Sequence, residues 1–265
     1  MELKHGHAFK RTLPPANTDF PVSATIPPKT SPFRPKPPPT LALAASATAA
    51  DSANIVGYTK IPVGRISLLG PMFVDVNAGV PSLQLGAIIP NGKYDDGVDV
   101  VQFLNLDGSL DWSAVYYGEG YGWYSGDKNG WVNTHDIDIG TGFVANTRSS
   151  DVEYCIAGEV NTNAIDVLVA QGIAVIGNAM PVTITLDQIV PGGSYDDGID
   201  VIQFLKPDGS LDWSAVYYGA GYGWYSGDKN GWVNSEELKP GEFIFALVKT
   251  AEGVMFSLPE LVIED

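Results

Sequence analysis

The chain writes one stretch of 40 residues twice, almost letter for letter. Residues 94–133 and 195–234 are identical at 35 of 40 positions, at a constant offset of 101 residues. The flanking segments agree only in pattern. Each copy of a tandem repeat is expected to adopt the same fold. We therefore expect a leader over residues 1–50, followed by a first module over 51–160 and a second module over 161–265.

The composition of the modules is typical of short β-strands joined by tight turns. Val, Ile, Tyr, Trp and Gly are abundant, and turn signals every 8–12 residues favour an antiparallel β-sandwich or barrel. We therefore predict an all-β fold with two tandem antiparallel modules behind a disordered, Pro-rich segment. Strands are expected in the first module near 54–61, 66–74, 98–105, 111–117, 142–147 and 152–158, with a helical turn at 83–88.

One hairpin turn can be predicted in detail. Asp107-Gly108 alone indicates a type I′ turn between two β-rich runs. The second module has Pro207-Asp208-Gly209 there, and proline suits the first central position of a type I turn. Since one turn should serve both modules, we predict a type I turn followed by a glycine bulge.

The leader and the net charge bear on location and partners. Residues 1–40 hold ten of the 19 prolines, which predicts disorder, and Ala47-Thr48-Ala49 fits the end of an export signal or an Ala-rich linker. After residue 50, nine Lys and Arg stand against 29 Asp and Glu, a balance that disfavours nucleic acid as a partner. No run of 18 apolar residues predicts a transmembrane helix. We expect a secreted or cell-surface protein.

Aromatic residues are the strongest functional signal. Residues 94–133 contain nine of them, and the two repeated stretches hold all six tryptophans. Gly-spaced Tyr and Trp form rigid stacking surfaces, yet such rings also fill small cores. Trp112 and Phe103 are predicted to be core, whereas the surface alternative is kept for an aromatic platform comprising Tyr121, Trp123, Tyr124, Trp131, Tyr222, Trp224, Tyr225 and Trp232.

Acidic residues recur with the repeat. Calcium binds several oxygen ligands from one loop, so a calcium site remains open at Asp95 and Asp96 and at Asp196 and Asp197. Aspartate is also a common turn former, and that explanation is favoured. No other cofactor is indicated.

The copies disagree where catalysis would need them to agree. His135 is replaced by Glu236 and Cys155 by Ser257, so neither can serve a function common to both modules. Adjacent carboxylates such as Asp95 and Asp96 would point to opposite faces of a strand instead of across a cleft. We therefore predict that the protein is not an enzyme.

Short motifs outside the repeated stretch resemble uncharacterised secreted bacterial tandem-repeat proteins. The motifs are Asn54-Ile55-Val56-Gly57-Tyr58, Ile176-Gly177-Asn178-Ala179-Met180, Gly140-Thr141-Gly142-Phe143 and Ala157-Gly158-Glu159-Val160. The chain departs from the pattern in two places. Those proteins have a Trp before their L-I-G segment, where this chain has Arg65-Ile66-Ser67, and Pro240-Gly241-Glu242-Phe243 lacks a second glycine. The resemblance implies an exported, non-catalytic β-protein at the cell surface.

Two functions are consistent with these features. The first is an extracellular structural or adhesive protein that self-associates. The alternative is a bivalent carbohydrate-binding protein with one aromatic platform per repeat, since two sites gain avidity on a polymeric ligand. A second copy of the chain, a glycan or another surface ligand is the expected partner.

Overall fold

The structure is a computed structural model that describes residues 56–75, 81–95, 98–193, 200–219 and 221–261. These residues belong to one compact unit of the chain, Asp51–Asp265. Within them the structure consists of antiparallel strands and two short 3-10 turns, which confirms the all-β prediction. No helix in the described part is long and apolar enough to cross a membrane. The predicted leader lies outside the described residues.

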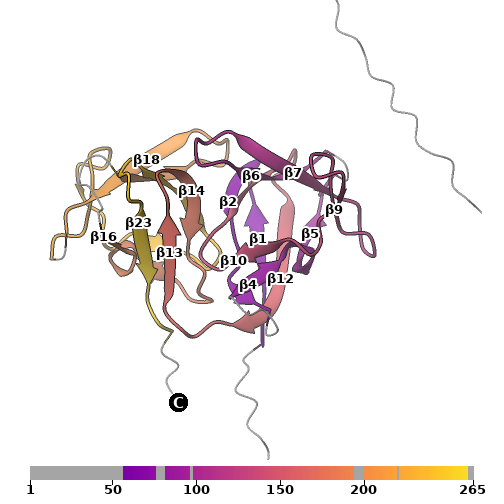
Figure 1. Ribbon diagram of the computed structural model, residues 1–265, viewed down its shortest axis with the longest axis horizontal. Helices are drawn as coiled ribbons and strands as arrows, with labels where there is room; N and C mark the ends of the chain where they lie inside the picture. Colours follow the sequence, from indigo (N-terminus) through magenta and orange to yellow (C-terminus); the bar gives the residue numbers. More distant parts are fainter. Residues whose placement is uncertain (1–55, 76–80, 96–97, 194–199, 220, 262–265) are drawn as a thin grey trace, which may run out of the picture. The chain divides into compact units, whose positions relative to one another are not determined.

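The first module contains three sheets (Figure 1). One sheet joins β1 (Val56–Val63), β12 (Val152–Val160), β3 (Phe73–Val74) and β5 (Ile88–Gly92). The second is six-stranded and runs in the order β2 (Ile66–Leu69), β11 (Phe143–Asn146), β6 (Val100–Leu104), β7 (Leu110–Tyr116), β8 (Trp123–Ser125) and β9 (Gly130–Trp131). A small third sheet pairs β4 (Ser82–Gln84) with β10 (Asp136–Asp138), and the predicted helical turn is η1 (Leu85–Ala87).

The second module repeats this arrangement. Its three-stranded sheet comprises β13 (Ile165–Val169), β23 (Val254–Leu258) and β16 (Val190–Gly193). Its six-stranded sheet comprises β14 (Gly172–Gly177), β22 (Phe243–Val248), β17 (Val201–Leu205), β18 (Leu211–Tyr217), β19 (Trp224–Ser226) and β20 (Gly231–Trp232). The remaining elements are β15 (Ile184–Thr185), β21 (Glu237–Leu238) and η2 (Leu186–Gln188).

Each module packs its two larger sheets around a hydrophobic core, as in a β-sandwich, and the core of the second module also takes in Ile139 of the first. In the first module, Tyr154 and Ile156 come from the β12 sheet, while Val101 and Trp112 come from the six-stranded sheet. Trp112 stacks on Phe103 with ring centroids 4.1 Å apart. Trp112 is a core residue, as predicted, whereas Phe103 is partly buried and packs against the core.

The two modules contact each other through reciprocal turns. The backbone N–H of Ile66 in β2 donates to the carbonyl of Pro207 at 2.9 Å, and the N–H of Ile173 in β14 donates to the carbonyl of Leu106 at 2.6 Å. Leu106 and Pro207 occupy the same position in the β6–β7 and β17–β18 turns. The turn of each module therefore rests on the first strand of the other module's six-stranded sheet.

A separate buried cluster lies beneath these turns. It consists of Leu68 and Val144 from the first module with Val175 and Phe243 from the second. One isolated bridge, Thr141 to Ile176, also connects the modules, whereas every multi-residue ladder in the described part lies within one module. Apolar contact and turn docking therefore join the modules.

Candidate functional site

Strand alternation divides the aromatic residues of the repeated stretch between two faces. On β7, Trp112, Ala114 and Tyr116 are buried against the core. Tyr117, the next residue, has half of its surface exposed. On β8, Trp123 is buried whereas Tyr124 lies on the outer side, opposite Val115 and Trp131. Because successive side chains of a strand point to opposite faces, one aromatic-rich segment supplies both a core and a surface.

The prediction that Trp123 and Trp224 belong to an exposed platform is wrong. Both side chains are 0% exposed. The indole N–H of Trp123 donates to the carbonyl of Ile88 at 2.9 Å, and that of Trp224 donates to Ile189 at 3.0 Å. Each ring lies at a strand position whose side chain points into the core. Its one polar atom, the indole nitrogen, donates to a backbone carbonyl of the opposing sheet or of the turn before it. These two residues are core residues.

The outward-facing aromatic residues of the repeated stretch form one cluster in each module, which we call the aromatic patch. Tyr121 and Trp131 are 65% and 52% exposed, and Tyr222 and Trp232 are 66% and 52% exposed. The patch of the first module is Tyr117, Tyr121, Tyr124 and Trp131; that of the second is Tyr218, Tyr222, Tyr225 and Trp232. Tyr117 and Tyr218 were missed as site residues, although alternation from Tyr116 and Tyr217 indicates that they point outward.

The rings of each patch meet at large angles. Tyr117 and Tyr124 have ring centroids 6.2 Å apart at 84°. Trp131 lies 5.9 Å from Tyr117 at 77° and 5.4 Å from Tyr124 at 76°. Tyr121 is closer to parallel with Trp131, at 6.0 Å and 27°. The patch is therefore a set of walls at right angles and not a flat platform.

The second patch reproduces this geometry. Tyr218 and Tyr225 are 6.1 Å apart at 87°, and Trp232 lies 5.4 Å from Tyr225 at 76°. Tyr222 and Trp232 are 6.0 Å apart at 28°. The four side chains of this patch line a hollow of about 370 Å³ that opens to solvent.

A glycine-rich loop places Tyr121 beside Trp131. Gly118, Gly120 and Gly122 all have positive φ, and the N–H of Gly122 donates to the Gly118 carbonyl at 3.0 Å. Side chains other than glycine rarely adopt this conformation. The Asn133 side chain closes the loop, because its Oδ1 accepts from Trp123 N at 2.6 Å and its Nδ2 donates to the Tyr121 carbonyl at 2.8 Å. The loop is thus tied to the strand that carries Tyr124.

The acidic residues mostly serve turns and loops. Asp99 is buried, and its carboxylate accepts from the backbone N–H of Asp95 at 2.9 Å and of Arg148 at 2.8 Å. Asp107 accepts from the N–H and hydroxyl of Ser109, and these hydrogen bonds lower the pKa of the Asp107 carboxyl below its usual range. Backbone and hydroxyl donors therefore occupy carboxylate oxygens that a cation would need.

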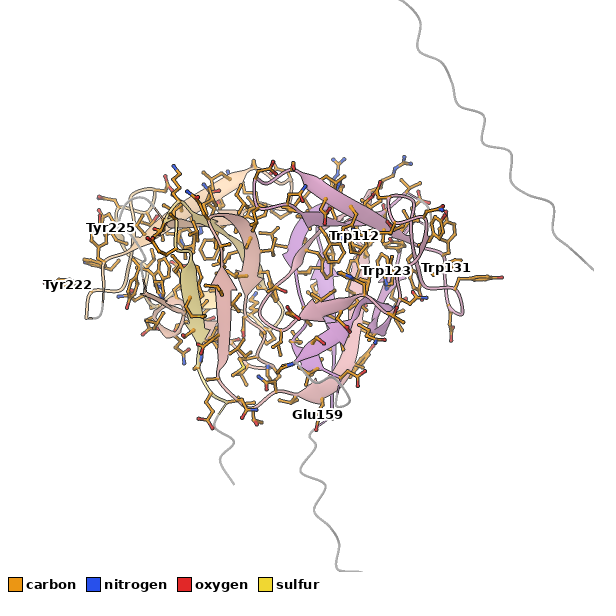
Figure 2. The ribbon with its side chains drawn as sticks, viewed as in Figure 1. Trp112, Trp123, Trp131, Glu159, Tyr222 and Tyr225 are labelled. Carbon is orange, nitrogen blue, oxygen red and sulfur yellow. The ribbon has the colours of Figure 1, made fainter. Side chains whose placement is uncertain are left out.

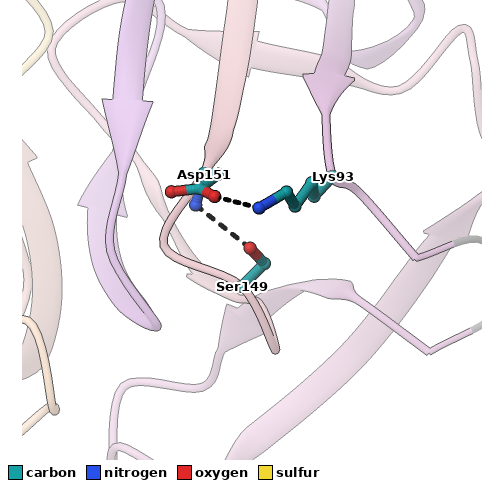
Figure 3. Close-up of polar contacts among 3 residues, drawn as sticks. All are labelled: Lys93, Ser149 and Asp151. Carbon is teal, nitrogen blue, oxygen red and sulfur yellow. Dashed lines mark hydrogen bonds and ion pairs between the residues drawn. The ribbon is translucent and has the colours of Figure 1, made fainter.

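A calcium site is not assembled in the described residues. Asp95 lies 3.8 Å from the guanidinium of Arg148. Asp151, immediately before β12, pairs with Lys93, and its N–H donates to Ser149 Oγ at 3.1 Å (Figure 3). In the part of the chain that the structure describes, no three acidic, His or Cys side chains come together to hold a metal. Asp96, Asp196 and Asp197 lie outside that part.

His135 and Cys155, which the second module replaces with other residues, both contact neighbouring side chains of the fold. The His135 ring lies edge-on to Phe103 and Trp112, with centroids 5.1 and 4.7 Å away. Burial beside these rings lowers the pKa of its imidazole. The Cys155 thiol accepts a hydrogen bond from the Tyr58 hydroxyl at 3.5 Å.

Among the residues that the structure describes, the two patches are therefore the candidate site that both modules share. Comparison of the chain with models of protein families, with curated proteins and with solved structures finds no match.

Proposed function

We propose that this chain is an extracellular, non-catalytic adhesive protein whose two aromatic patches are equivalent binding sites. One observation carries the proposal: the same four rings are presented to solvent twice, with centroid distances that agree within 0.1 Å for the three pairs compared above. Large aromatic rings gathered at a surface forgo the free energy that burial would supply. An exposed apolar cluster of this kind marks an interaction site.

The positions of the patches within the compact unit support a bridging role. Figure 2 draws Trp131 projecting on one side of the unit and Tyr222 and Tyr225 on the other. Two sites that face different directions hold two separate bodies more readily than two neighbouring points of one chain. On a polymeric or surface-bound ligand, two weak sites act together and raise the apparent affinity well above that of either site.

A carbohydrate ligand is a second candidate, and the Tyr121–Trp131 pair favours it. These two rings are near parallel and are the most exposed of the first patch. The face of such a ring can stack against the C–H face of a pyranose. Self-association is the third form that adhesion could take, with the patch of one copy against the patch of the next.

Attachment of the full chain to immobilised polysaccharides and to a glycan array tests the proposal. We expect Trp131→Ala and Trp232→Ala each to reduce retention by about tenfold or more through lost avidity, and the double variant to lose retention. Tyr58→Ala is the matched control, because Tyr58 is equally exposed but lies outside both patches. Sedimentation at increasing concentration reports self-association in the same proteins. If the double variant were retained and sedimented like the parent chain, the patches would not be the adhesive sites.

A further inference from the structure

We propose that each aromatic patch binds a quaternary ammonium group, such as the head of choline or of a trimethylated amine. The inference rests on the proposed function to the extent that it takes the patches as binding sites. It goes further by naming the chemical group recognised, whatever polymer, lipid or protein carries that group.

The first argument is the ring geometry. Tyr117, Tyr124 and Trp131 lie at 76–84° to one another with centroids 5.4–6.2 Å apart. Three mutually perpendicular rings at this spacing can all present a face to one point about 4 Å from each centroid, well inside the ~6 Å range of cation–π attraction. The walls of such a corner match a compact, rounded cation better than they match a flat sugar ring.

The second argument is that open space is bordered by these rings. In the second module the hollow of about 370 Å³ is lined, among the described residues, by the aromatic side chains of Tyr218, Tyr222, Tyr225 and Trp232. A quaternary ammonium group carries methyl groups and no N–H, so it needs no hydrogen-bond acceptor and is well suited to an all-aromatic lining. A sugar would bring several hydroxyl groups, which need polar partners around their edges.

The third argument is charge. The chain has 31 acidic and 15 basic side chains, so its field attracts cations. Asp127 lies in the turn after Tyr124, and its carboxylate accepts from the N–H of Ser113, on the same outer face of β7 as Tyr117. Asp228 does the same with Ser214 in the second module.

The lysine of the same turn lies against a ring outside the patch. Lys128 Nζ lies 5.5 Å from the ring of Trp112, whose side chain belongs to the core face of the sheet and not to the patch face. Its counterpart Lys229 lies 3.9 Å from the Trp213 ring and pairs with Glu236 at 2.8 Å. The turn therefore contributes a negative charge to the outer face and directs its positive charge to an aromatic ring on the other face.

Titration of the full chain with two matched probes tests the inference. Choline carries the quaternary nitrogen, and 3,3-dimethylbutan-1-ol has the same shape with carbon in its place. Binding is followed by isothermal titration calorimetry and by the methyl resonances of each probe, because the Trp→Ala variants lack the patch indoles on which a fluorescence signal would depend. We expect choline to bind at least about fivefold more tightly than the neutral alcohol. The double variant W131A/W232A should lose this binding, W131F/W232F should retain part of it, and Tyr58→Ala should bind like the parent.

The inference would be overturned by equal binding of choline and the alcohol, or by choline binding that survives the double Trp→Ala substitution. Absence of choline binding to the parent chain would overturn it as well. The attachment assay is read separately. A parent chain that ignores choline but loses surface attachment in W131A/W232A leaves the adhesive function standing and removes only the quaternary ammonium ligand.

Discussion

At the scale of single residues, parity along a strand decides whether an aromatic ring is core or surface. Trp123 and Trp131 have the same side chain and lie eight residues apart, yet the first is fully buried and the second is half exposed. Trp123 stacks with Tyr154 at 6.3 Å and 6° in the core. The chemistry of the side chain alone does not separate these roles; its position on the pleated strand does.

This difference predicts opposite results in unfolding experiments. Trp123→Ala should lower the free energy of unfolding by about 3–5 kcal/mol, because it leaves a cavity and an unpaired Ile88 carbonyl. Trp131→Ala should change the same quantity by less than about 1 kcal/mol, because about half of the side chain is in water and it lies outside the core. Urea titration of both variants measures this. A large loss of stability in W131A would mean that its ring supports the fold and is not free to bind.

At the scale of elements, the β6–β7 hairpin shows how a turn is specified. Gly108 has φ +82°, its N–H donates to the Asn105 carbonyl at 2.9 Å, and the β6–β7 register shifts between Phe103 and Leu104. Asp107 does not have positive φ. These values confirm the predicted type I turn with a glycine bulge and exclude type I′. Pro207, the counterpart of Leu106 in the second copy, is the residue that distinguishes type I from type I′, because its fixed φ suits a type I turn.

Substitution of turn glycines tests this account. Gly108→Ala and Gly120→Ala should each lower the free energy of unfolding by about 1–2 kcal/mol, since both require φ near +85°. A Cβ at Gly108 would also meet Ile173 Cδ1 at 2.7 Å, whereas nothing lies within 4 Å at Gly120. Gly126→Ala is the control, with open space, no positive φ and an expected change below about 0.5 kcal/mol. Thermal or urea unfolding that ranked Gly126→Ala with the other two would contradict the assignment.

At the scale of the whole compact unit, the reciprocal turns and the cluster around Phe243 couple two cores. Leu68 of the first module and Val175 of the second both lie in that cluster, and neither belongs to the main core of its module. Coupled modules unfold together as long as the free energy of their contact is comparable to the difference between their separate stabilities. The unit should therefore behave as one cooperative body.

Calorimetry checks the coupling. The parent chain should unfold in one transition, and Leu68→Ser should lower its stability by about 2–4 kcal/mol and broaden or divide the transition. Leu168→Ser is the control, because Leu168 is 65% exposed on β13; it should leave the profile unchanged. A parent chain with two well-separated transitions would show that the modules are energetically independent.

Much of the fold was predictable from sequence because it depends on local patterns. The hairpin over 98–117 and the helical turn before Ile88 both follow from residue types at fixed spacing. The site was only partly predictable. Tyr121 and Trp131 are exposed as the surface alternative requires, but Trp123 is not, because the segment 118–122 interrupts the strand and its glycines determine on which face β8 resumes. That path depends on positive φ at three glycines, which no alternation rule supplies.

The docking of each turn on the other module has a consequence for how this gene can change. The contacts with Ile66 and Ile173 are made by the main-chain oxygens of Pro207 and Leu106, so these side chains could diverge between the copies, as they have. Turn geometry could not diverge in this way, because a displaced turn in one copy removes the hydrogen bond of a strand in the other. A mutation that moves either turn therefore affects the stability of both modules. The geometry of the two turns is therefore constrained jointly, although the turns lie in separate copies.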